Sequence, residues 1–148
     1  MEVLIVTGFL HIKNRKGLEL LYDELKIKYK IGSINDIKAT FLVDTGASNS
    51  CLSIESKDLY NLKTQGEKFE ASGASDKKME AILSKECKFK LGRFLMKKQK
   101  FVLLDLNHIN SLLESQNIKK IDGIIGAEFL KANKAVIDYD NLNLFLKS

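Results

Sequence analysis

The stretch Phe41-Leu42-Val43-Asp44-Thr45-Gly46-Ala47-Ser48 runs from an apolar segment directly into a carboxylate, a hydroxyl and a glycine. An ionised aspartate at the end of a buried strand is costly unless backbone N–H groups donate hydrogen bonds to it. Gly46 permits a tight turn that aims N–H groups back at the Asp44 carboxylate, and Thr45 adds a hydroxyl beside it. An ordinary surface turn is the alternative for an Asp-Thr-Gly triplet alone. The apolar run before the triplet and the Ala-Ser pair after it argue against that alternative.

A second stretch of similar character is Ile121-Asp122-Gly123-Ile124-Ile125-Gly126-Ala127-Glu128-Phe129-Leu130. Two apolar residues precede Gly126 and a short amphipathic segment follows it. This pattern predicts a buried strand over 121–125 that turns sharply into a helix over 127–132. Taken alone, it also fits a generic strand–turn–helix unit.

The rest of the chain consists mostly of short alternating or apolar segments, which predict a mostly β fold with a few short helices. We expect the other strands over 2–6, 25–31, 37–43, 67–72, 78–84, 87–91, 100–104, 135–139 and 142–146. Turns are expected at Gly32–Asp36, Ser72–Asp76, Gly92 and Asp140-Asn141. Helices are expected over 54–62, where Ser53 is the N-cap, and over 106–116, while 14–23 forms a loop or a short helix.

Length and composition limit the class of protein. The 148 residues fit one domain, so we expect a single domain over 1–148. The hydrophobic fraction of 45% and the charged fraction of 29% are typical of globular chains. No apolar run reaches the roughly 18 residues that a membrane-spanning helix needs, and the N-terminus lacks the features of a secretory signal. We therefore expect a cytoplasmic protein with no membrane partner.

Charge and cysteine content argue against two further classes. The 24 Lys and Arg residues are interleaved with 19 acidic residues, and the densest basic runs lack the aromatic residues of a nucleic-acid platform. We therefore expect no nucleic-acid partner. Cys51 and Cys87 have no CxxC spacing, and His11 and His108 are the only histidines, so the chain lacks the ligands for a zinc site. We expect two buried thiols, no metal and no cofactor.

Together the two stretches, LVDTGAS at 42–48 and GIIGAEFL at 123–130, resemble the motifs of the retropepsin-like aspartic proteases. This is the family of the retroviral proteases and their cellular and bacterial relatives. In that family an apolar Asp-Thr-Gly-Ala-Ser/Thr motif precedes an apolar-apolar-Gly motif that leads into the C-terminal helix, in the order and at the spacing found here. The resemblance covers about residues 24–148 as the protease core and leaves 1–23 as an extension without a clear counterpart. It implies a closed β-barrel with one lobe per chain.

The resemblance also implies roles for individual residues. Asp44 is then the catalytic carboxylate, Thr45 bonds across to the backbone of a partner subunit, and Gly46 donates its N–H to the carboxylate. Ala47 stands where the related pepsins usually have a serine that hydrogen-bonds the aspartate, which implies activity at mildly acidic to neutral pH. The residues expected to contact substrate are Ala47, Ser48, Ser72, Gly73 and Ala74, the last three from a flap that closes over an extended peptide.

The chemistry of this motif requires a second copy of the chain. Amide hydrolysis without a metal or a covalent nucleophile needs a base for the water and an acid for the carbonyl oxygen. Two carboxylates that share one proton supply both. The chain has one Asp-Thr-Gly: Asp122 precedes a glycine but lacks the hydroxyl, and no such turn contains Asp105, Asp138 or Asp140. The second carboxylate must therefore come from a twofold homodimer, with the strand 142–147 as the candidate interface.

The sequence thus predicts a homodimeric aspartic endopeptidase that cleaves a peptide or an unfolded protein segment. The alternative is a catalytically idle peptide-binding or dimerisation module on the same fold. Two features depart from a minimal retroviral protease. The flap is polar at Ser75-Asp76-Lys77-Lys78, and the chain carries additional segments at 1–23 and 105–120.

Overall fold

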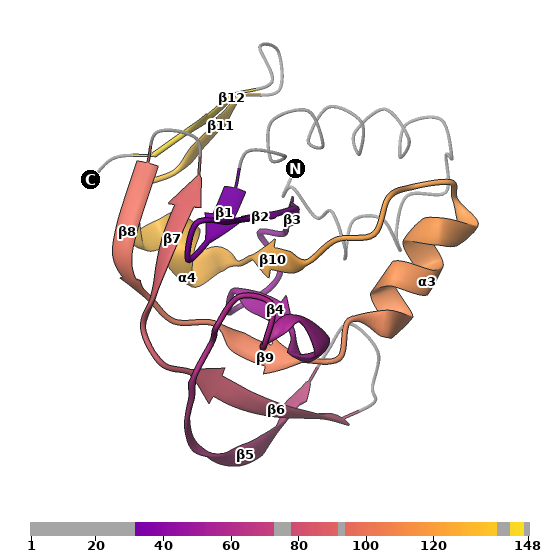
Figure 1. The fold of residues 1–148 in the computed structure, drawn as a ribbon. Coiled ribbons are helices and arrows are strands. Elements are labelled where there is room, and N and C mark those ends of the chain that lie inside the picture. The colour runs from indigo at the N-terminus through magenta and orange to yellow at the C-terminus, as the bar shows by residue number, and fades with distance from the viewer. Residues whose placement is uncertain (1–31, 73–77, 92–93, 139–142, 147–148) are drawn as a thin grey trace.

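The computed structural model describes residues 32–72, 78–91, 94–138 and 143–146, which form three hydrogen-bonded sheets and a few short helices (Figure 1). The first sheet has the order β2 (Ile37–Ala39), β1 (Gly32–Ile34), β7 (Cys87–Leu91) and β8 (Phe94–Gln99). The second has the order β3 (Phe41–Val43), β10 (Gly123–Ile125), β4 (Cys51–Ser53), β9 (Val102–Leu104), β6 (Lys78–Ser84) and β5 (Thr64–Ser72). The third pairs β11 (Val136–Asp138) with β12 (Asn143–Phe145). The helical elements are the 3₁₀ turn η1 (Ile54–Ser56), α3 (Asn107–Ser115) and α4 (Ala127–Ala132).

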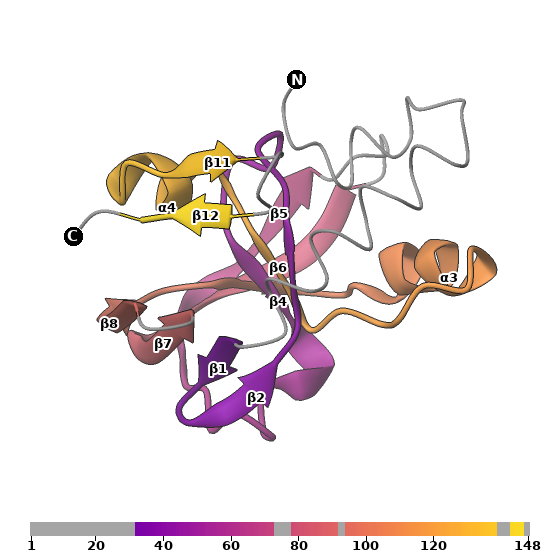
Figure 2. The same ribbon diagram turned by 90° about the horizontal axis from the view of Figure 1, so that it is seen from above.

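The two motifs meet in the middle of the architecture. Strand β10 pairs in parallel with β3 and antiparallel with β4, so that Ile125 lies opposite Val43 and Ile124 opposite Leu42. Seen from above, α3 lies on one side of the sheets, and α4 with β11 and β12 lies on the other (Figure 2). In the described part of the chain no helix is long and apolar enough to cross a membrane.

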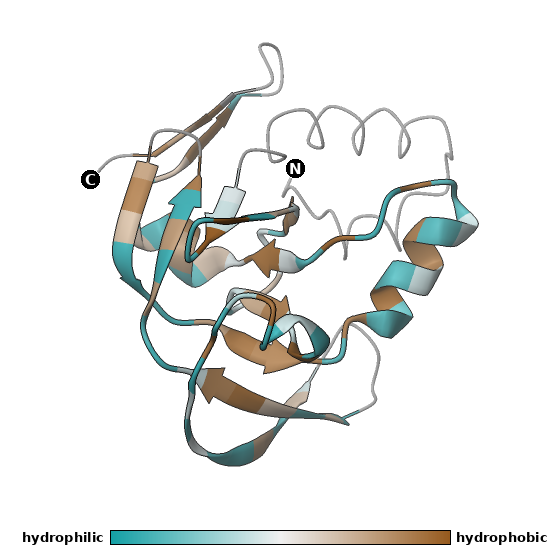
Figure 3. Ribbon diagram, in the orientation of Figure 1, coloured by the Kyte–Doolittle hydropathy of each residue, from teal (hydrophilic) through white to brown (hydrophobic). Residues whose placement is uncertain are grey.

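Four phenylalanines join the sheets into one core. Phe89 of β7 is fully buried. Its ring makes edge-to-face contacts with the rings of Phe41 in β3, Phe129 in α4 and Phe101 just before β9, and the ring centroids lie 5.2–5.4 Å apart. Such geometry adds to the stabilisation that comes from burial alone. In the hydropathy colouring of Figure 3, β9 and β10 are largely apolar, whereas α3 alternates between apolar and polar stripes. The core therefore lies between the first two sheets and α4.

Several sequence predictions are confirmed. The hairpin predicted over 67–72 and 78–84 is β5–β6, and the hairpin over 135–139 and 142–146 is β11–β12. The remaining confirmed elements are the strands at 87–91 and 121–125 and the helices at 106–116 and 127–132. The predicted elements 2–6, 14–23 and 25–31 and the turns at Gly92 and Asp140-Asn141 lie outside the described residues. The predicted turn Ser72–Asp76 also lies outside them, except for Ser72, which ends β5. The closed barrel is not among the described strands, which form separate sheets.

The predicted turn at Gly32–Asp36 is shorter than expected, and the strand predicted over 37–43 is interrupted. The turn contains only Asn35 and Asp36, both with positive φ (48° and 68°), because these side chains tolerate the left-handed region. Thr40 interrupts the strand where the chain passes from the first sheet to the second. Its N–H donates to Asp122 Oδ2 at 2.7 Å, and its carbonyl accepts from Asp122 N–H at 2.8 Å.

The helix predicted over 54–62 was wrong. Only the three residues of η1 are helical, and Ser53 makes no side-chain capping bond because it is buried in β4. The chain bends further at Asn61, whose φ of 53° is incompatible with a continuing helix. This bend lets both Tyr60 and Leu62 reach the core, although their spacing does not fit one helical face.

The strand predicted over 100–104 was also only partly right. Strand β7 pairs with β8, which the sequence did not predict, because the run Lys97-Lys98-Gln99-Lys100 hides the end of this edge strand. The segment Val102–Leu104 instead enters the second sheet, between β4 and β6. An unpredicted strand thus forms the outer edge of the first sheet.

We expect Phe89→Ala to lower the free energy of unfolding by about 3–5 kcal/mol, because it removes the ring on which three others pack. Urea unfolding followed by circular dichroism at one protein concentration measures this loss. The control is Leu95→Ala on the neighbouring strand β8, where 43% of the side chain is exposed and the loss should stay below about 1 kcal/mol. Equal losses in the two variants would contradict the assignment of the core.

Candidate active site

Asp44 lies at the point where β3 ends and is only 2% exposed. Its N–H donates to the carbonyl oxygen of Ile125 at 2.9 Å, which continues the β3–β10 pairing by one residue. The N–H of Gly46 donates to Asp44 Oδ1 at 2.8 Å, as the sequence predicted. A hydrogen bond from a backbone donor favours the charged form of a carboxylate. The local backbone thus supports a buried acid at this turn.

Gly126 allows the second motif to lie directly against the turn that follows Asp44. A Cβ atom at Gly126 would lie 2.6 Å from the carbonyl carbon of Asn49 and 2.9 Å from the carbonyl oxygen of Ala47. No side chain fits at such distances, so glycine is required by close approach rather than by its φ. The N–H of Ala127 donates to the same Ala47 oxygen at 2.7 Å and joins the two segments.

Ser50 and Glu128, which the sequence analysis did not select, form a second connection between the motifs. The Ser50 N–H donates to Glu128 Oε1 at 2.7 Å, and the Ser50 hydroxyl accepts from Gly126 N–H at 2.9 Å. Ser50 is 1% exposed, so both bonds are shielded from water. The available signal was a polar residue inside the second motif, Glu128, and another two residues after the first motif, Ser50. Because the two residues are 78 positions apart, the sequence alone did not connect them.

The structure describes all four of the predicted residues that follow Asp44. Thr45, Gly46, Ala47 and Ser48 form the turn after Asp44, where Ala47 is half-buried and Ser48 exposed. The Thr45 Oγ1 atom is buried and has no hydrogen-bond partner among the described residues.

The predicted flap is described only in part. Ser72 is the exposed last residue of β5, and Gly73 and Ala74 lie outside the described residues. The described residues therefore gather Asp44 and the four residues after it in one turn.

The Cys51 thiol lies within the electrostatic reach of two carboxylates. Burial raises the pKa of this thiol to about 12, and the negative charges of Glu128 and Asp44 act in the same direction. A backbone hydrogen bond at Ile124 opposes the rise in pKa. A thiol so far from ionisation is a poor nucleophile and a poor metal ligand. Among the described residues no group of three or more His, Cys, Asp and Glu side chains could hold a metal ion.

Comparison with known proteins agrees with this geometry. The sequence model of the aspartyl protease family matches residues 31–129, which include both motifs. The chain belongs to the aspartyl protease family. No curated protein matches the chain.

Several solved structures have a fold similar to that of this aspartyl protease family member. The retroviral protease-like domain of Ddi1 from Leishmania major is similar with a TM-score of 0.54 and 17% identity, over 78% of this chain and 83% of that one. EIAV protease complexed with the inhibitor HBY-793 gives 0.48 and 20%, over 72% and 88%. A retropepsin-like aspartic protease from Rickettsia conorii gives 0.42 and 21%, over 72% of each chain. The retropepsin-like fold that the two motifs predicted is confirmed. The domain limits 1–148 and 24–148 stay predictions.

The raised thiol pKa predicts how the stability of this aspartyl protease family member depends on pH. The unfolded thiol ionises near its ordinary value of 9.0, whereas the folded Cys51 keeps its proton to about 12. The contribution of the Cys51 thiol to the free energy of unfolding is therefore complete below pH 9.0. Above pH 9.0 this contribution decreases by at most about 1.4 kcal/mol per pH unit. Cys51→Ala should remove this part of the slope.

Urea unfolding at several pH values from about 8 to about 10.5 measures the slope. The control is Ser53→Ala, which truncates another small buried side chain of β4 but removes no titrating group. Cys87, whose pKa burial raises to about 11, keeps its own contribution to the slope in both variants. The prediction fails where Cys51→Ala shows the same slope as Ser53→Ala.

Proposed function

We propose that the protein is an aspartic endopeptidase in which two Asp44 carboxylates, one from each subunit of a homodimer, activate a water molecule. The observation that carries the proposal is the buried Asp44 carboxylate, which accepts the Gly46 N–H in a turn packed against Gly126. Membership of the aspartyl protease family supports it. No metal or cofactor enters the reaction.

The proposed reaction uses the two carboxyl groups as an acid and a base. One of the pair is ionised and the other protonated, since adjacent like charges do not both ionise readily. The ionised Asp44 takes a proton from water, whose oxygen attacks the peptide carbonyl carbon. The carboxyl of the partner subunit's Asp44 gives its proton to the carbonyl oxygen. The resulting diol collapses when the first carboxyl protonates the amide nitrogen, the C–N bond breaks, and a diol proton returns to the second carboxylate.

Two observations support a homodimer. The buried Thr45 Oγ1 has no partner among the described residues, and a backbone acceptor from a second subunit would satisfy it. Val136 and Phe145 form a cross-strand pair on β11–β12, and each is 51% exposed. An apolar pair at this place suits an isologous contact between two copies of this sheet, which includes part of the expected interface strand 142–147.

The other predicted residues take supporting roles in this proposal. Ala47 and Ser48 contact the substrate beside Asp44, and Ser72, Gly73 and Ala74 belong to the flap that closes over it. Ala47 offers no hydroxyl to the catalytic carboxylate, and we therefore expect activity at mildly acidic to neutral pH. The substrate is a peptide or an unfolded protein segment that binds in an extended conformation.

We expect Asp44→Asn to lower the rate of peptide cleavage at least about 100-fold, because an amide serves neither as the base nor as the acid. The measurement is cleavage of a diverse peptide pool by the purified full chain from acidic to neutral pH, with products identified by mass spectrometry. Asp58→Asn, at an exposed position outside the site, is the matched control and should cleave like the unmodified chain.

A dimeric protein that cleaves no peptide at any pH would overturn the protease proposal. That result would favour the alternative, an idle peptide-binding or dimerisation module of the same fold. Cleavage that persists in Asp44→Asn would also reject the proposed carboxylate pair.

Thr45→Val should weaken the dimer, because the change keeps the shape of the side chain but removes the hydroxyl. One hydrogen bond is lost from each subunit, so we expect the dimer dissociation constant to rise at least about fivefold. Sedimentation velocity over a range of protein concentrations measures this constant. Thr64→Val on β5 is the control and should leave it unchanged. An unmodified chain that is monomeric while it cleaves peptides would refute the shared site.

A further inference from the structure

The strands of the first sheet carry lysines and no acidic side chain. Strands β2, β1, β7 and β8 read IKA, GSI, CKFKL and FLMKKQ, and none of them contains Asp or Glu. In β7 the buried residues Cys87, Phe89 and Leu91 alternate with the exposed Lys88 and Lys90. Because successive side chains of a strand point to opposite faces, the apolar ones face the core and the lysines face away from it.

The register of the sheet brings further residues onto this outer face. Ser33 of β1 lies opposite Lys38 of β2 on one side and opposite Lys90 of β7 on the other. Lys90 also lies opposite Leu95 of β8, whose side chain is 43% exposed. Side chains that lie directly opposite each other share a face, so one row across the sheet reads Lys38, Ser33, Lys90 and Leu95. In Figure 2 these four strands lie on the lower side of the molecule, and α4, β11 and β12 lie on the upper side.

A second row of lysines lies next to the first. Lys88 is two residues before Lys90 on the same face, about 7 Å away along the strand. A register shift between β7 and β8 then leaves the exposed Lys97 beside Lys88. Within the described part of the chain, Lys88 forms an ion pair with Asp36 at 2.7 Å, whereas the ion pairs there include none of Lys38, Lys90 and Lys97. We call Lys38, Lys88, Lys90, Lys97 and Leu95 the lysine face.

The second sheet arranges its exposed charges differently. On the hairpin β5–β6, Lys68 pairs with Glu80 at 2.7 Å and Lys78 pairs with Glu70 at 3.1 Å. Opposite charges on neighbouring strands stabilise a sheet, whereas like charges destabilise it. The lysine face lacks this compensation, and a partner with negative charges would supply it.

Protection of an exposed sheet edge does not explain the lysine face. Lysines on an edge strand prevent it from pairing with other chains, which would account for Lys97 of β8. Strand β7, however, lies inside the sheet between β1 and β8. Its Lys88 and Lys90 therefore protect no edge, and their charges call for another explanation.

A layer of buried aromatic rings separates the lysine face from Asp44. Phe89, between Lys88 and Lys90, points inward, and the centroid of its ring lies 5.2 Å from that of Phe41 in β3. Asp44 follows directly after β3. The lysine face is therefore not part of the candidate active site.

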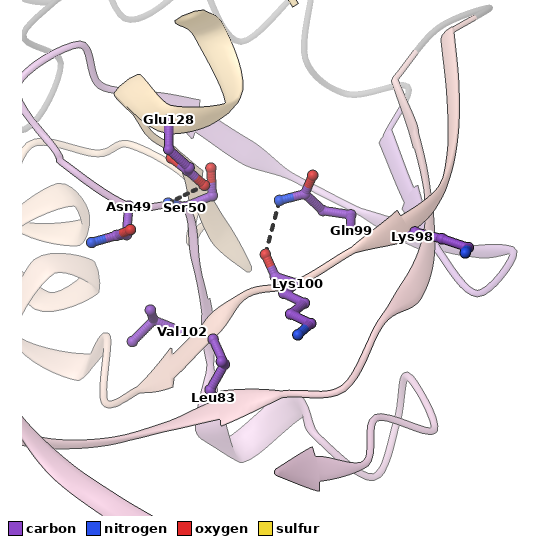
Figure 4. Close-up of a pocket in the computed structure, with 8 residues that line it drawn as sticks. All are labelled: Asn49, Ser50, Leu83, Lys98, Gln99, Lys100, Val102 and Glu128. Atoms are coloured by element: carbon purple, nitrogen blue, oxygen red, sulfur yellow. Dashed lines mark hydrogen bonds between the residues drawn. The ribbon is translucent and has the colours of Figure 1, made fainter. Parts of the chain in front are cut away.

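The lysine face ends after Lys97. Figure 4 shows the next part of the chain, where Lys98, Gln99 and Lys100 line a pocket of about 320 Å³ whose other wall includes Glu128. The Gln99 side chain is 8% exposed and donates from Nε2 to the Lys100 carbonyl oxygen at 2.8 Å. We therefore leave Lys98 and Lys100 out of the lysine face.

We propose that the lysine face binds an acidic segment of a partner protein. Carboxylates accept charge-assisted hydrogen bonds from ammonium groups. Alternate residues of an extended segment are about 7 Å apart, which matches the spacing of Lys88 and Lys90. Leu95 offers a contact to one apolar side chain of such a segment. A nucleic acid fits less well, because the residues that form the lysine face include no aromatic side chain on which bases could stack. The inference does not depend on the proposed protease function.

The test is the fluorescence anisotropy of a fluorescein-labelled dodecapeptide of glutamates and interspersed leucines, titrated with the full-length Asp44→Asn chain, which cannot cut the probe. We expect binding that weakens as salt is added, because salt screens exposed charges. The triple variant Lys38→Gln, Lys90→Gln and Lys97→Gln, in the same background, should raise the dissociation constant at least about tenfold.

The matched control is a second triple variant with the same loss of charge outside the first sheet. It combines Lys63→Gln, Lys120→Gln and Lys131→Gln, three exposed positions that lie before β5, between α3 and β10, and in α4. This control should bind the acidic peptide within about twofold of the parent chain, since the contacts of the lysine face are intact. Thermal unfolding of both triple variants verifies that they keep the fold.

Three results would overturn the inference. The first is an acidic peptide that does not bind at low salt. The second is an equal loss of binding in the two triple variants, because net charge alone would then explain it. The third is tighter binding of a single-stranded thymidine oligonucleotide of the same charge, which would assign the face to nucleic acid. Peptide cleavage by the unmodified chain is measured separately, so failure of the protease proposal leaves this test unchanged.

Discussion

The parallel pairing of β3 with β10 is the constraint on which the rest of the structure depends. It brings Val43 opposite Ile125, and the bond from Asp44 N–H to the Ile125 oxygen extends the pairing into the active-site turn. Gly126 then passes so close to the backbone of Ala47 and Asn49 that no side chain could be accommodated. One strand pair and one glycine thus determine where the carboxylate of the candidate site lies. The buried phenylalanine rings, which include Phe41 of β3 and Phe129 of α4, pack together beside this pair of strands.

Three carboxylates serve a common purpose in this molecule, because each accepts a backbone N–H next to the end of a strand. Asp44 accepts from Gly46 after β3, Asp122 accepts from Thr40 between β2 and β3, and Glu128 accepts from Ser50 before β4. Hydrogen bonds to charged groups contribute about 1.5–3 kcal/mol each, more than neutral ones. Acidic residues within apolar motifs therefore stabilise the irregular backbone around the site.

Sequence patterns identified the elements whose signal is local. The alternating hairpin β5–β6, the amphipathic α3 and the two glycine-containing motifs were predicted because neighbouring residues are sufficient to define them. The helix predicted over 54–62 failed because a single left-handed residue, Asn61, diverts the chain. Strand β8 was missed because its lysines carry no apolar periodicity, although its partner β7 provides the backbone hydrogen bonds.

The sequence analysis missed part of the site for a different reason. Ser50 and Glu128 act on each other across 78 positions, and no local pattern encodes such a contact. The turn around Asp44 was accessible from the sequence because a carboxylate, a hydroxyl and a glycine lie next to one another in it. Its distant supports, such as the hydrogen bond between Ser50 and Glu128, depend on tertiary packing.

The separation of the two motifs along the chain affects the order of events during synthesis. Asp44 leaves the ribosome early, but its backbone partner Ile125 and the glycine beneath the turn follow roughly eighty residues later, which at about 5–20 residues per second is a delay of several seconds. Until then the carboxylate has neither the strand pairing nor the close support described above. Non-local parallel pairing of this kind also forms slowly in the complete chain. A nascent chain of this family member is therefore unable to assemble the turn, and any hydrolytic activity is confined to molecules whose synthesis has passed the second motif.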